Sequence, residues 1–267
     1  EKDNLKIKLD YNFNIKFLKF IKLFLTSIII FLFTYLLYDK KRLFDFSIYA
    51  VSILSTLILT FIRDFNLLVG LRYYRGGADG LLHYGFGRDI IENLDKSSLL
   101  LALEGGEKIF YFMPGLRYFS AFNNILFGET TYGYLIACTF IPLLIYKIFE
   151  KLISKKVALL LFISFIFLPI FENMGFGFFN YIWQFARHHA ESLSILFFLY
   201  GLYLIICLQE KNYDNISIYL IGIMLSICVF VRPNFIPSSM ILFICTIIIL
   251  IKIKEYSKII RILLSYS

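Results

Sequence analysis

Charged residues are scarce in this chain of 267 residues, at 17% of the sequence, whereas hydrophobic residues make up 59% and include 31 phenylalanines. A soluble domain carries about 25% charged residues. This chain therefore has too little polar surface to cover a globule of its length. The composition excludes a soluble globular protein and predicts an all-α integral membrane protein that crosses the bilayer several times.

Cysteine and histidine are also few. The sequence has 4 cysteines, and Cys138, Cys207, Cys228 and Cys245 all fall in apolar runs without metal-ligand spacing. They are expected to act as small hydrophobic side chains. Because there are only 3 histidines and two of them are adjacent, we expect no zinc site. No cofactor is certain; a divalent metal is possible, but no residue pattern supports one.

Apolar runs that could cross a hydrocarbon layer of about 30 Å as helices recur along the chain. We expect spans at Phe17–Tyr38, Phe46–Ile62, Thr130–Phe149, Val157–Phe171, Ser192–Gln209, Ile216–Val231 and Phe235–Ile251. The expected fold is a polytopic transmembrane helix bundle, with residues 1–267 as one domain. Because the chain starts without methionine and stops within an apolar pattern, we expect a fragment of a longer protein.

Lysine and arginine collect in particular loops, and short basic loops stay on the cytoplasmic side of a membrane. The basic groups lie at 40–42, 147–156 and 252–261. Counting crossings from them places three stretches on the outer side, namely 63–129, 172–191 and the turn at Arg232. A basic rim beside anionic membrane lipids explains the net charge of +8, so no nucleic-acid partner is expected.

The first outer loop, 63–129, is polar and rich in glycine. Charge and glycine are both costly inside lipid, so their concentration here suggests a functional site. If Asp79 opens a helix, the macrodipole favours its anionic form, and His83 follows one turn later on the same face. Arg72, Arg75 and Arg88 could then surround a phosphate-bearing ligand. The alternatives are an Asp79 that only caps the helix, a packed or surface His83, and arginines that contact lipid headgroups. Glycines on both sides of Asp79 suggest that something approaches the backbone closely.

The loop also predicts short interfacial helices. Pro114 suits the first turn of a helix and Gly128 suits its end, and the helix between them is too short to span a membrane. The aromatic residues at its start are typical of a membrane-interface belt.

The second outer loop, 172–191, ends in a polar cluster at the start of a helix. Arg187 and His188 could contact phosphate, and Glu191 could orient them, although ordinary loop polarity is the alternative. Arg232 ends another apolar run just before Pro233, where it either snorkels to the interface or binds phosphate. Arginines from separate outer segments thus favour an anionic lipid headgroup as ligand.

The pattern resembles the polytopic glycosyltransferases of the GT-C fold, which use polyprenyl-phosphate sugars and include the protein-mannosyl and aminoarabinose transferases. The resemblance rests on the stretch from Arg75 to Tyr84, on Tyr111–Phe119 with Phe127-Gly128-Glu129, and on Arg232-Pro233. Many relatives carry two adjacent acids where this chain has Ala78-Asp79. This departure argues against a mechanism or a metal site that needs a carboxylate pair.

The resemblance implies a GT-C-like bundle that transfers a sugar from a polyprenyl-phosphate donor to a glycan, lipid or protein hydroxyl, with inversion. Asp79 would be the catalytic base, with His83 beside it. The groups that bind the substrate or its lipid phosphate would be Arg72, Arg75, Arg88, Arg117, Arg187, His188, Glu191 and Arg232. The expected location is a bacterial inner or plasma membrane, with the active site on the outer side.

Two other functions remain compatible with the sequence. A lipid-linked oligosaccharide polymerase or ligase would also have many spans, large outer loops and arginines. A transporter would place charges or broken helices at mid-membrane, whereas the apolar runs here are almost free of ionisable residues. The sequence therefore disfavours a transporter driven by coupled ions.

Overall fold

A computed structural model of the protein describes residues 43–63, 78–96, 98–105, 114–168, 177–210 and 215–266. Every regular element in these residues is a helix, which confirms the all-α prediction. The expected span Phe17–Tyr38, the loop residues Arg72 and Arg75, and the side chain of Asp79 lie outside the described residues.

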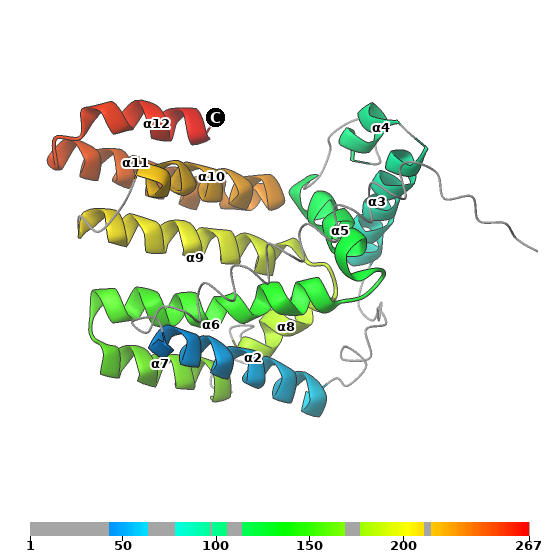
Figure 1. Ribbon diagram of the computed structural model, residues 1–267, viewed down its shortest axis with the longest axis horizontal. Coiled ribbons are helices and arrows are strands. Elements are labelled where there is room, and N and C mark those ends of the chain that lie inside the picture. The colour runs from blue at the N-terminus through cyan, green and yellow to red at the C-terminus, as the bar shows by residue number, and fades with distance from the viewer. Residues whose placement is uncertain are drawn as a thin grey trace, which may run out of the picture.

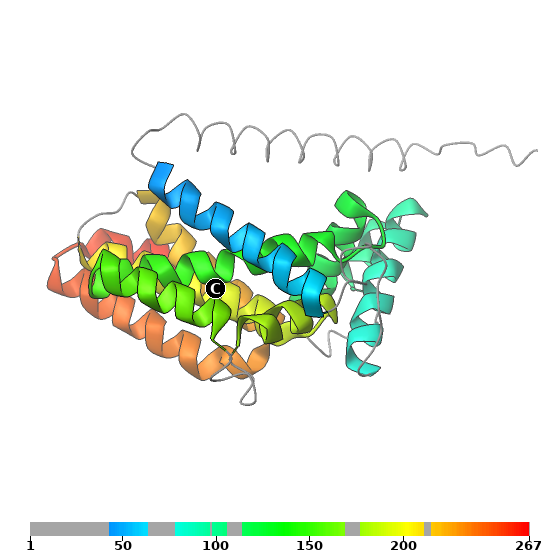
Figure 2. The ribbon, with the colours of Figure 1, turned by 90° about the horizontal axis from the view of Figure 1, so that it is seen from below.

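Long helices lie side by side and form a bundle (Figures 1 and 2). They are α2 (Leu43–Arg63), α6 (Tyr132–Leu152), α7 (Lys155–Phe167), α9 (Ala190–Gln209), α10 (Asn215–Val231) and α11 (Ile236–Lys252). Shorter elements complete it: α8 (Phe178–Ala186), the 3-10 turn η4 (Pro233–Phe235) and α12 (Tyr256–Tyr266). The remaining helices, α3 (Ala78–Asp95), α4 (Leu99–Leu103) and α5 (Pro114–Phe127), are grouped at one end of the bundle (Figure 1).

Four of the described helical stretches are long and apolar enough to cross a membrane, namely Phe46–Arg63, Tyr132–Leu152, Ala190–Gln209 and Pro233–Lys252. Each coincides with an expected span. Along α11, the side chains of Ile241, Ile244 and Ile248 are exposed on one face. In water such a continuous apolar face would be unfavourable, so it suits a lipid environment.

Two expected spans form shorter helices. The apolar part of α10 covers Ile216–Val231, and α7 has 13 residues, which corresponds to about 20 Å of helix. Helix α7 was expected to reach Phe171, but it ends at Phe167. Leu168 has an extended backbone, with φ −89° and ψ 121°, because the residue before a proline is pushed out of the helical region and Pro169 follows it.

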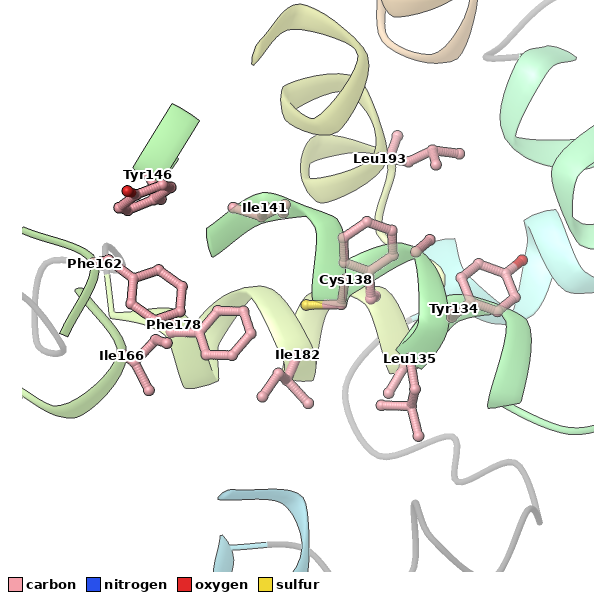
Figure 3. Close-up of a cluster of buried hydrophobic side chains, with 14 of the residues drawn as sticks. Tyr134, Leu135, Cys138, Ile141, Tyr146, Phe162, Ile166, Phe178, Ile182 and Leu193 are labelled. Carbon is pink, nitrogen blue, oxygen red and sulfur yellow. The ribbon is translucent and has the colours of Figure 1, made fainter. Parts of the chain in front are cut away.

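The main hydrophobic core surrounds α6 (Figure 3). Tyr146 and Phe162 meet edge to face with ring centroids 6.2 Å apart, and they join α6 to α7. Phe178 and Ile182 bring the buried face of α8 into the same core. This packing holds α8, and therefore the turn that follows it, against the bundle at the end where α6 and α9 begin.

The α3–α5 group packs closely on itself. A Cβ on Gly87 of α3 would lie 2.6 Å from Ser120 Oγ of α5, so only glycine allows this approach. The Tyr118 hydroxyl donates to the Leu103 carbonyl, and burial raises the pKa of this phenol, which keeps it protonated as a donor. Helix α5 begins at Pro114 and ends before Gly128, whose φ is +68°, as the sequence predicted.

Candidate functional site

The start of α3 lies directly against the turn between α8 and α9. A Cβ on Gly80 would lie 2.1 Å from the carbonyl oxygen of Arg187 and 3.2 Å from its carbonyl carbon. The glycines around Asp79 suggested a close approach to the backbone, and at Gly80 the approaching group is this carbonyl. Since Asp79 precedes Gly80 in the first turn of α3, its backbone lies beside the turn that carries Arg187.

His188 forms the buried part of this turn. Its side chain is 1% exposed and its φ is +58°, in the left-handed region that histidine adopts more readily than most residues. The imidazole ring lies 4.4 Å from the ring of Tyr134 and 5.6 Å from that of Tyr84, measured between centroids. His188 therefore connects the turn to α6 and α3 and lies inside the wall of the site.

Arg187 precedes His188 in the same turn and is half-buried. Its guanidinium carbon is 3.7 Å from the ring centroid of Trp183, one helical turn earlier in α8. The ring of His189 is 5.8 Å from that of Trp183. The indole face adds a cation–π attraction, and a planar guanidinium has the fork of donors that suits carboxylate or phosphate.

Glu191, in the first turn of α9, forms an ion pair with Arg232, the residue before η4. The distance between Arg232 Nη2 and Glu191 Oε1 is 2.8 Å. Because Pro233 cannot continue α10, the chain turns at Arg232, whose backbone is extended with φ −143° and ψ 102°. The pair joins the starts of α9 and η4 at the end of the bundle where α3 docks.

His83 also lies in α3, one turn after Asp79, and only 5% of its side chain is exposed. It therefore belongs to the packed face of α3. Among the described residues, no group of three or more His, Cys, Asp and Glu side chains could hold a metal ion.

Two predicted ligand arginines lie elsewhere in the α3–α5 group. Arg117 is 1% exposed, lies 4.0 Å above the ring centroid of Phe86 and donates to the Gly105 carbonyl at 3.2 Å. Arg88 is exposed and pairs with Glu129 at 3.1 Å. Arg117 thus holds α5 against α3, and Arg88 joins α3 to the turn after α5.

The structure thus brings the start of α3 against the turn that carries Arg187 and His188, and it pairs Glu191 with Arg232. Sequence reasoning missed Trp183, Tyr84 and Tyr134. The spacing of four residues between Trp183 and Arg187 could have indicated the stacked pair, because residues four apart share a helix face. The enclosure of His188 by Tyr84 and Tyr134 depends on tertiary packing and has no local signal.

Comparison with models of known protein families, with curated proteins and with solved structures finds no match to this chain. The functional argument therefore depends on the chemistry of the site.

Proposed function

We propose that this protein is a multi-pass membrane glycosyltransferase that moves a sugar from a polyprenyl-phosphate donor to a hydroxyl acceptor. The observation that supports this most is the contact between Gly80 and the Arg187 carbonyl. It brings the helix start that carries Asp79 beside a turn that carries a stacked arginine. A base and a phosphate-binding cation are the parts that such a transfer requires.

The donor is a phosphodiester that joins a prenyl chain to the anomeric carbon of a sugar. The acceptor oxygen attacks that carbon from the opposite side, and Asp79 accepts the hydroxyl proton. The bond between the anomeric carbon and the phosphate oxygen breaks, and its electron pair leaves with the prenyl phosphate. Arg187 and Arg232 stabilise the charge that develops on this leaving group.

The remaining residues of the site have supporting roles in this proposal. His188 and His83 are buried and hold the turn and α3 in place, so we assign no proton transfer to either. No metal takes part in the steps described. The prenyl chain of the donor extends into the membrane beside the apolar helices.

The proposed site faces away from the cytoplasm. Lysines lie at the other end of the bundle, at the end of α6 and the start of α7, and basic loops stay inside. A site on the outer face would take donors that have already been moved across a plasma membrane. Acceptors there are glycans, lipids or proteins of the cell envelope.

The proposal is tested by incubating the full-length protein in proteoliposomes with a panel of polyprenyl-phosphate sugars and acceptors, and measuring the prenyl phosphate released. Asp79→Asn should lower transfer by about 10³-fold, because general base catalysis contributes roughly 10²- to 10⁴-fold. Asp89→Asn is the matched control, since Asp89 is an exposed carboxylate on the same helix. Full activity of Asp79→Asn, or an equal loss in both variants, would contradict the assignment.

A further inference from the structure

The ion pair between Glu191 and Arg232 leaves both groups within reach of a ligand. The Arg232 side chain is 25% exposed and the Glu191 side chain is 37% exposed. Glu191 lies in the first turn of α9. A carboxylate therefore lies on an arginine that the proposed function assigns to phosphate. Carboxylate and phosphate accept from the same guanidinium donors.

Glu191 carries one negative charge and lies against Arg232. A phosphodiester also carries one negative charge, so Glu191 repels it less than it repels a ligand with two. A phosphate monoester carries about −1.5 to −2 at pH 7, because its second pKa is near 6.

We infer that Glu191 is a specificity-determining residue that makes the site selective for the phosphodiester donor over the monoester product. This inference depends on the proposed function, because that function supplies both lipids. Transfer converts a donor with one negative charge into a product with two, and the acceptor proton passes to Asp79. Once the bond to the sugar breaks, the carboxylate of Glu191 repels the extra charge of the product and speeds its release.

Electrostatics sets the size of the expected effect. A single carboxylate interacts about twice as strongly with a doubly charged ligand as with a singly charged one at the same place. Removing that carboxylate should therefore change the logarithm of the affinity for a monoester about twice as much as that for a diester. A carboxylate that only fixed the position of Arg232 would produce no such ratio.

The experiment measures binding to the full-length protein in nanodiscs at pH 7.5. The probes are radiolabelled farnesyl phosphate, a monoester, and its methyl diester. Glu191→Gln should tighten binding of the monoester by about tenfold and of the diester by about threefold. Glu191→Asp should keep the wild-type preference, and Glu129→Gln, which removes an exposed carboxylate paired with Arg88, should change neither affinity.

Three results would overturn the inference. They are weaker binding of both probes to Glu191→Gln, an equal change for both probes, and no binding of either probe to the wild-type protein. None of these depends on turnover. If the protein binds both probes with the expected ratio but transfers no sugar, then the charge selectivity stands and the proposed function fails. In an active protein, Glu191→Gln should also increase inhibition by farnesyl phosphate.

Discussion

The two ends of the bundle both carry charge, but they hold it differently. At the end where α6 and α9 finish, Lys147 pairs with Glu150 at 3.2 Å and Lys151 pairs with Glu210 at 2.5 Å. At the end where these helices begin, Arg187 lies on Trp183 and Arg232 pairs with Glu191. The charges at the first end belong to lysines, whose side chains are flexible. Those at the second end belong to arginines, one held by an aromatic ring and the other by a carboxylate that is distant in the sequence.

This difference has a physical meaning. Lysine is a strongly hydrated point charge that suits a membrane surface, whereas the planar guanidinium recognises phosphate through two parallel hydrogen bonds. A left-handed backbone occurs at both ends, at His188 and at Lys254. The close approach of α3 to the Arg187 carbonyl at Gly80 belongs to the arginine end. Under the proposed function, ligand recognition belongs to the arginine end and membrane anchoring to the lysine end.

Among the variants that test this comparison, Gly80→Ala should have the largest effect, on both stability and transfer. The added Cβ would meet the Arg187 carbonyl at 2.1 Å, and a backbone atom cannot move aside as a side chain end can. We expect a loss of about 1–3 kcal/mol in the free energy of unfolding, together with loss of transfer, because α3 must move away from the turn. Thermal unfolding in detergent and the transfer assay measure the two effects.

Gly85→Ala is the matched control for this prediction. Gly85 lies in the same helix, and a Cβ there would meet no heavy atom within 4 Å. Alanine should therefore stabilise α3 by up to about 1 kcal/mol through helix propensity. Equal behaviour of the two variants would show that the contact between Gly80 and Arg187 does not position α3.

An intermediate effect is expected when the two kinds of cation are exchanged. Arg187→Lys should weaken binding of farnesyl phosphate by about tenfold, because lysine loses the stacking on Trp183 and the fork of N–H donors. Lys151→Arg at the other end should leave this affinity unchanged. Radiolabelled ligand binding checks both variants, and an unchanged affinity of Arg187→Lys would remove the distinction between the ends.

The smallest effect should appear in the lysine pairs. A double-mutant cycle between Lys151 and Glu210 should give a coupling of about 1 kcal/mol or less, because both side chains are partly exposed to solvent and the pair is screened. Thermal unfolding of the two single variants and the double variant measures it. A coupling well above 2 kcal/mol would mean that this end is fixed as firmly as the arginine end.

Much of the fold could be predicted from the sequence, because hydropathy and helix boundary residues act locally. The run Thr130–Phe149 became α6 with small shifts at both ends, and Pro114 and Gly128 marked the limits of α5. Pro169 could also have predicted where α7 ends.

The site was less predictable, because the sequence shows which residues are polar but not which way they face. Arg117 and Arg187 both lie in segments that the sequence predicts on the outer side. Yet the first is buried over Phe86 and the second lies on Trp183 at the end of the bundle. The pairing of Glu191 with Arg232 also depends on how α9 and η4 pack, which no local pattern encodes.

The most direct test of the account is photoaffinity labelling of the full-length protein in nanodiscs with a farnesyl phosphate analogue that carries a benzophenone. Labelled peptides are mapped by mass spectrometry, with and without excess farnesyl phosphate as competitor. The account predicts competed labelling within residues 177–191 and 231–236, at the arginine end. Competed labelling confined to residues 147–156, at the lysine end, would contradict it.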